Sequence, residues 1–135
     1  MFLGYNWPGL CCLAIILVLT GIPGNYMPSI QSFWNWLGPD KVAHLVMYGT
    51  FSYLLLRGFQ KQTQFPGLQS NFVIYAMLIG IIFGAFTEVM QRYVFSGRNA
   101  NIYDFLANVA GCFAGLAVYY LINRKLKKII KIINN

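Results

Sequence analysis

The chain has 135 residues, of which 58% are hydrophobic and 10% charged, and it carries a formal net charge of +7. A soluble domain of this size would carry about 25% charged residues, because most of its surface faces water. The composition therefore excludes an ordinary soluble domain. Its apolar residues fall in blocks that are long enough, at about 1.5 Å per helical residue, to cross a bilayer. The chain is predicted to be an integral membrane protein in direct contact with membrane lipids.

The blocks predict an all-α membrane protein, a bundle of four transmembrane helices that forms a single domain over residues 1–135. They cover residues 7–22, 42–59, 72–95 and 105–122. A cleaved signal peptide is the alternative for the first block, but that block lacks a basic n-region and an A-x-A-like cleavage site. After it, the stretch SIQSFWNWLG (residues 29–38) predicts a short interfacial segment, because tryptophan prefers the headgroup level. The polar stretch QKQTQFPGLQS predicts a loop between the second and third helices.

Basic residues predict the orientation of this bundle. With four spans, the loop after the second helix and the C-terminal tail share one side, and together they hold seven of the ten Lys and Arg residues. Positive residues favour the cytoplasm, so both termini are expected to be cytoplasmic. The net charge is explained by topology, and no nucleic-acid partner is expected.

The tail RKLKKIIKII places apolar residues at helical spacing with lysines between them. The apolar positions are Leu126, Ile129, Ile130 and Ile133. Such a basic amphipathic tail suits a helix lying on the anionic inner leaflet. A plain cytoplasmic extension of the fourth helix is the other interpretation.

The three carboxylates and the single histidine of the chain are expected to meet at the outer end of the bundle. Asp40 begins the second span, Glu88 lies near the end of the third, and Asp104 begins the fourth. His44 follows Asp40 by one helical turn. Ionisable residues in membrane spans are costly and are usually functional.

Helical spacing predicts that three helices turn polar and small residues toward one another. The faces are Lys41, His44 and Tyr48 on the second helix; Ala76, Gly80, Gly84, Glu88 and Gln91 on the third; and Asp104, Asn108, Gly111 and Gly115 on the fourth. Small residues four apart let membrane helices approach closely, so Glu88 should point into the bundle.

This ordered set, together with Gly97-Arg98, resembles the VanZ-like membrane proteins over residues 38–118. Asn101 is a departure, since many relatives have a serine or an acidic residue between the arginine and the aspartate. The family's namesake is associated with reduced susceptibility to teicoplanin, a lipoglycopeptide antibiotic that acts at the outer membrane face. The resemblance implies a multi-pass protein of the bacterial cytoplasmic membrane with its polar site on the outer face.

Two functions from different classes follow from this arrangement. The first is a pocket that binds an anionic cell-envelope lipid or a lipoglycopeptide, with Lys41 and Arg98 holding the anionic group. The second is a small intramembrane enzyme that uses His44 and Glu88 for acid–base chemistry on a lipid-linked envelope substrate. The candidate catalytic residues are His44, Glu88 and Asp104; the candidate ligand-binding residues are Asp40, Lys41, Tyr48, Gln91, Arg98 and Asn108.

Other interpretations stay open. In a purely structural network, Lys41 would pair with Asp40, and Arg98 would pair with Asp104 or Glu88. A divalent metal could be held by His44, Glu88 and Asp104, but the nearby cations oppose it, and no cofactor or metal is predicted. Transport would require an oligomer, which is possible. The three cysteines lie in apolar spans and are expected to be core residues.

Overall fold

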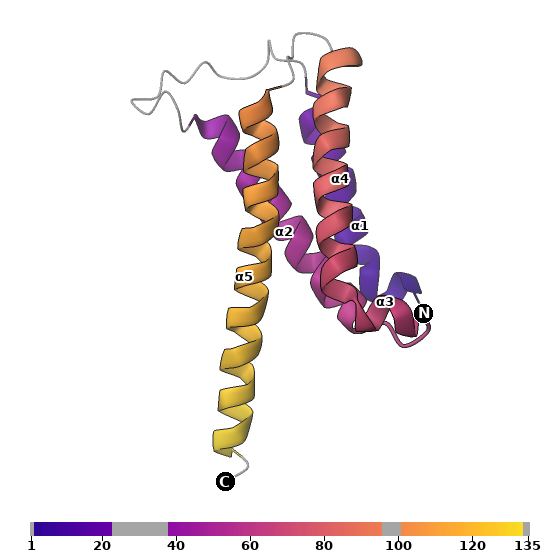
Figure 1. Cartoon of the computed structure of the whole chain (residues 1–135), viewed down its shortest axis with the longest axis vertical. Coiled ribbons are helices and arrows are strands. Elements are labelled where there is room, and N and C mark those ends of the chain that lie inside the picture. The colour runs from indigo at the N-terminus through magenta and orange to yellow at the C-terminus, as the bar shows by residue number, and fades with distance from the viewer. Residues whose placement is uncertain (1, 23–37, 96–100, 134–135) are drawn as a thin grey trace.

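Figure 1 presents a computed structural model of the chain, in which residues 2–22, 38–95 and 101–133 are described. Regular secondary structure in these residues is helical, as predicted. The helices are α1 (Phe2–Thr20), α2 (Pro39–Gln60), α3 (Pro66–Ser70), α4 (Phe72–Tyr93) and α5 (Ile102–Ile133). The four long helices run alternately up and down, so α1 begins and α5 ends on the same side of the bundle (Figure 1). The predicted interfacial segment lies outside the described residues, except for Gly38.

Three of the described helices are long and apolar enough to cross a membrane. They are Phe2–Thr20, Phe72–Tyr93 and Ile102–Lys131. The sequence predicted four such crossings, and α2 is the exception because polar residues interrupt its apolar run. It has 22 residues, as many as α4, and packs against α1, α4 and α5. Two of its polar side chains, His44 and Ser52, are buried and bond α5, whereas Asp40 and Arg57 are exposed near its two ends. Both pairs make the helix less apolar than its neighbours.

Large apolar side chains cover the outside of the bundle. Val18 on α1 is 69% exposed, Ile82 on α4 is 65% exposed and Leu121 on α5 is 58% exposed. Soluble monomers rarely leave continuous apolar surface of this extent uncovered. Lipid chains are the solvent that suits such an exterior.

Glycines bring the helix backbones together inside the bundle, most closely where α2 crosses α5. A Cβ atom added at Gly111 would lie 2.5 Å from the carbonyl oxygen of Leu45, and one at Gly115 would meet the carbonyl oxygen of Gly49. On α4 the predicted stripe is confirmed, since Ala76, Gly80 and Gly84 are all buried. A Cβ at Gly84 would lie 3.1 Å from Cβ of Asn108. The glycines thereby set the distances at which the polar side chains of three helices meet.

The helices differ from the sequence-based prediction at the start of α1, in the additional helix α3 and at the end of α5. α1 begins at Phe2 instead of residue 7 and includes Pro8 within the helix, which is tolerated in membrane helices whose neighbours satisfy the freed backbone groups. The carbonyl of Phe2 accepts hydrogen bonds from the side chains of Asn6 and Gln62. α3 forms within the stretch expected to be a loop. α5 continues through the basic tail to Ile133 and projects beyond the bundle, so the tail is an extension of this helix (Figure 1).

Candidate functional site

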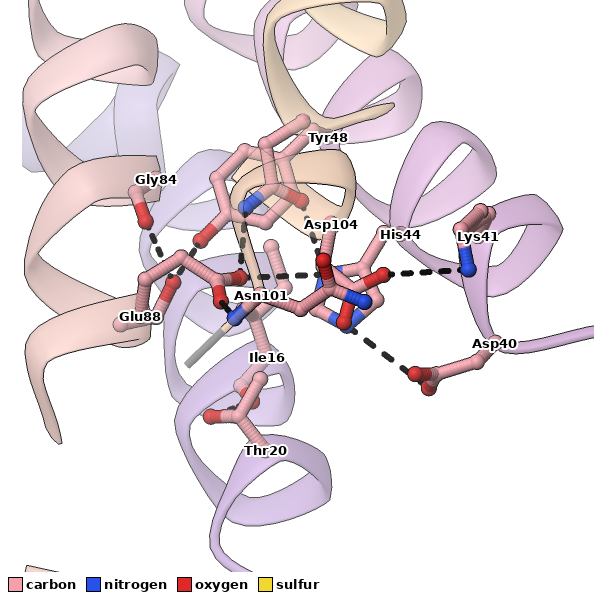
Figure 2. Close-up of polar contacts among 12 residues, drawn as sticks. Ile16, Thr20, Asp40, Lys41, His44, Tyr48, Gly84, Glu88, Asn101 and Asp104 are labelled. Carbon is pink, nitrogen blue, oxygen red and sulfur yellow. Dashed lines mark hydrogen bonds and ion pairs between the residues drawn. The ribbon is translucent and has the colours of Figure 1, made fainter. Parts of the chain in front are cut away.

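The first two turns of α2, the last turns of α4 and the first turns of α5 meet in one polar cluster, on the side of the bundle opposite the two termini (Figures 1 and 2). His44, Asn108, Asp104 and Glu88 are buried within it, with exposed fractions of 1%, 0%, 5% and 6%. Figure 2 shows His44, Glu88 and Asp104 turned toward one another from three helices. The structure therefore brings the three candidate catalytic residues together.

Asn108 bridges His44 and Glu88 at the centre of the cluster. Its amide nitrogen donates to Oε1 of Glu88 over 3.3 Å, and its amide oxygen lies 2.8 Å from Nδ1 of His44. Because that oxygen can only accept, Nδ1 of His44 must carry the hydrogen. Oε1 of Glu88 lies 3.9 Å from Nδ1, so it faces the imidazole but forms its hydrogen bond with the amide.

The other ring nitrogen of His44 faces Asp40, and Asp104 lies nearby. Nε2 lies 3.8 Å from Oδ1 of Asp40, whose side chain is 49% exposed. Asp104 is buried on α5, and its Oδ1 atom lies 3.7 Å from Nζ of Lys41. Lys41 thus pairs with Asp104 across two helices, and the pairing with Asp40 proposed for a structural network is wrong. The reason is geometric, since adjacent residues on a helix point about 100° apart.

Asn101 supports Glu88 from the start of α5. Its backbone N–H lies 3.4 Å from Oε2 of Glu88 and donates to it. Its side-chain oxygen accepts a hydrogen bond of 3.0 Å from the backbone N–H of Tyr103, as a helix-capping residue does. Both oxygens of the Glu88 carboxylate therefore have donors. The departure noted at Asn101 keeps a capping side chain at this position.

Tyr48 and Gln91 are buried but stand apart from the hydrogen bonds around His44. The Tyr48 hydroxyl lies 2.6 Å from Oγ1 of Thr87, which in turn donates to the carbonyl oxygen of Gly84 over 3.0 Å. The side-chain nitrogen of Gln91 has no hydrogen-bond partner among the described residues. Arg98, the remaining candidate, lies outside the described residues.

A groove between α4 and α5 opens beside the cluster. Its volume is about 560 Å³, and it is lined by Ala85, Glu88, Arg92, Asn101, Ile102 and Phe105. Glu88, Arg92 and Asn101 make part of the groove wall polar, and the other three side chains make the rest apolar. Glu88 therefore has two environments, since it contacts the buried amide of Asn108 and also lines the groove.

Residues 10–123, from within α1 to the middle part of α5, match the VanZ/LLP1 family. The chain belongs to the VanZ/LLP1 family. The match covers more of the chain than the resemblance over residues 38–118, because it includes most of α1. No curated protein and no solved structure matches the chain.

The described charged groups of the polar cluster in this VanZ/LLP1 member are mainly acidic, although the chain as a whole is basic. Asp40, Glu88 and Asp104 lie around one lysine and one histidine, and Lys41 is already paired. Metal-ligand atoms that lie within 4.8 Å of one another come from Asp40, His44 and Asp104, a set that differs from the predicted one by having Asp40 in place of Glu88.

Sequence reasoning left Thr87 and Arg92 out of the candidate site. Thr87 lies one residue before Glu88 and is fully buried. The sequence indicated this burial only through the position of Thr87 three residues after Gly84, on the small-residue face of α4. Arg92 is one of the three basic residues outside the two predicted inner regions, but its contact with the groove depends on how α4 and α5 pack.

Proposed function

We propose that this VanZ/LLP1 family protein binds the head group of an anionic cell-envelope lipid or of a lipoglycopeptide in the groove beside its polar cluster. The observation that carries the proposal is the groove between α4 and α5. Glu88, Arg92 and Asn101 line it together with Ala85, Ile102 and Phe105. Polar groups converging in an otherwise apolar hollow are typical of ligand sites, and an amphiphile has the complementary distribution of polarity.

Arg92 takes the role in anion binding that was expected of Lys41. The Lys41 ammonium is engaged by Asp104, whereas the Arg92 side chain is exposed at the groove. A guanidinium binds phosphate or carboxylate through two parallel hydrogen bonds. Glu88 accepts hydrogen bonds and would repel an anion, so in this proposal it receives the hydroxyl or amide hydrogens of a sugar or peptide group. Lipid-linked envelope intermediates and lipoglycopeptides offer both kinds of group.

The proposed orientation places this site at the outer face of the bacterial cytoplasmic membrane and both termini in the cytoplasm. It treats α2 as a fourth crossing. Its 22 residues correspond to a length of about 33 Å, enough to span a hydrocarbon core. Support comes from the distribution of basic residues, seven of ten of which lie on the side of the termini.

The test is binding of teicoplanin, and separately of phosphatidylglycerol, to the purified protein in nanodiscs made from zwitterionic lipid. Arg92→Gln should weaken saturable binding by about 10- to 100-fold, since hydrogen bonds to charged groups contribute about 1.5–3 kcal/mol. Arg57→Gln is the matched control, because Arg57 lies in the last turn of α2, at the opposite end of that helix from His44. Equal effects of the two variants, or no saturable binding by the parent, would contradict the proposal.

The contacts of His44 favour an intramembrane enzyme as a second candidate. Asn108 joins the buried imidazole to Glu88, which lines the groove, while Asp40 faces the opposite ring nitrogen at the surface. In this arrangement Glu88, which lines the groove, would exchange a proton with a bound substrate, and the Asn108 amide would orient Glu88 and His44. Incubation with a polyprenyl-phosphate-linked substrate separates the two functions. An enzyme converts many equivalents of substrate per protein, whereas a binding protein returns it unchanged.

A further inference from the structure

Three metal-ligand atoms converge on the surface side of His44, away from the groove. They come from His44, Asp40 and Asp104, each of which offers one ligand atom within 4.8 Å of the other two. We propose that these residues form a zinc site that is separate from the amphiphile-binding groove. One imidazole and two carboxylates, with water completing the shell, are a donor set that suits Zn²⁺.

The hydrogen bonds of His44 prepare its Nε2 atom to bind a metal. The amide of Asn108 is oriented by its donation to Glu88, and its oxygen fixes the hydrogen on Nδ1 of His44. The lone pair is therefore on Nε2, which faces Oδ1 of Asp40 at 3.8 Å. Metal-binding histidines usually donate their other ring N–H to an oxygen atom in this way.

The buried carboxylate of Asp104 attracts a cation, which in this structure is Lys41. The Asp104 side chain is 93% buried, with an exposed fraction of 7%, and its Oδ1 atom has no hydrogen-bond partner. Buried polar atoms usually have such a partner. Here the nearest cation is Nζ of Lys41, at 3.7 Å. Two carboxylate oxygens and a ring lone pair that face one another repel unless a cation or a proton lies between them.

The distances are compatible with closure around a zinc ion. Ligand atoms bound at about 2.1 Å in a tetrahedral site lie about 3.4 Å apart. The His44–Asp40 separation of 3.8 Å is close to this value. Asp40 lies in the first turn of α2 with an exposed side chain, so its carboxylate has room to move toward the other ligand atoms.

Lys41 competes with the metal for Asp104. With a neutral imidazole, the two aspartates carry two negative charges and Lys41 carries one positive charge. The lysine side chain is 23% exposed, so it can turn toward solvent when zinc binds. Removing this ammonium should therefore tighten zinc binding, whereas removing a ligand should weaken it.

The experiment measures zinc affinity by competition with a chromophoric chelator. The protein carries no histidine tag, because the chain has one histidine and a tag would add competing zinc ligands. Cys11 and Cys12 are replaced by serine, because these free thiols would bind zinc themselves. The purified protein is kept in detergent. The parent should bind one Zn²⁺ per chain. Asp40→Asn and His44→Gln should weaken binding at least tenfold, Lys41→Met should strengthen it, and Arg57→Gln should leave it unchanged.

Asp40→Asn is the decisive variant, because its exposed side chain can be changed without disturbing the fold. Zinc affinity equal to that of the parent in this variant would overturn the proposal. The absence of stoichiometric zinc binding in the parent would also overturn the proposal, and so would weaker binding after Lys41→Met. Either result would mean that Lys41 alone neutralises Asp104.

Discussion

Replacing Gly111 by alanine should push α2 and α5 apart. The added Cβ atom would lie 2.5 Å from the carbonyl oxygen of Leu45 and 3.1 Å from the backbone nitrogen of Gly49. Ordinary contact begins at about 3.5 Å, so the helices must separate by roughly 1 Å. Both neighbours are backbone atoms, and no rotamer change can relieve the overlap. Because α2 packs more extensively against α5 than against any other described helix, the strain falls on the largest contact in the bundle.

Overpacking typically costs about 1–3 kcal/mol, and the better helix propensity of alanine offsets up to about 1 kcal/mol. We expect Gly111→Ala to lower the free energy of unfolding by about 2 kcal/mol and the melting temperature by on the order of 5–10 °C. Thermal unfolding in detergent, followed by circular dichroism, measures the change. Gly67→Ala is the control with the same chemical change, because a Cβ atom there meets nothing within 4 Å. A Gly111→Ala melting temperature equal to that of the parent would refute the close backbone contact.

Gly84→Leu should destabilise the protein still more, because even a Cβ atom there lies 3.1 Å from Asn108, and the same melting experiment detects the loss. A parental melting temperature would rule out the stripe on α4. Tyr48→Phe should cost about 0.5–1.5 kcal/mol by removing the hydroxyl that bonds Thr87, so an unchanged unfolding free energy would exclude that bond. In a cysteine-free background, Tyr93→Cys should react with an impermeant thiol reagent from outside and Lys128→Cys only after permeabilisation. The reverse labelling would invert the proposed topology.

The arrangement of the helices followed largely from hydrophobic blocks, but their ends did not. The block ending at residue 122 marks where apolar residues give way to lysines, whereas α5 continues to Ile133. Because Lys, Leu and Ile are all compatible with a helix, the helix continues past the residue at which the apolar block ends. Hydrophobic blocks predicted four membrane crossings, whereas three of the described helices are long and apolar enough to cross. On α2, the buried polar residues His44 and Ser52 depend on contacts with α5, which hydropathy does not encode.

The candidate site was predicted as a set of residues but not as a set of contacts. Spacing along each helix placed His44, Glu88, Asp104 and Asn108 on inward faces, and all four are buried. Which side chain meets which depends on the register between helices. The backbone contacts of Gly111 and Gly115 with α2 set that register, and no pattern within a single helix encodes it. The Lys41–Asp104 pair and the groove contact of Arg92 could not be predicted for this reason.

The most direct measurement of a functional role for the polar cluster is teicoplanin tolerance per folded molecule in a bacterium expressing the chain. His44→Gln and Glu88→Gln keep a polar side chain of similar size but remove the titratable group. Tolerance and the amount of protein in the membrane are measured together. A functional site predicts that the parent raises tolerance, and that both variants accumulate in the membrane without raising it. Lower abundance with tolerance per molecule retained would contradict it and make the cluster a structural network.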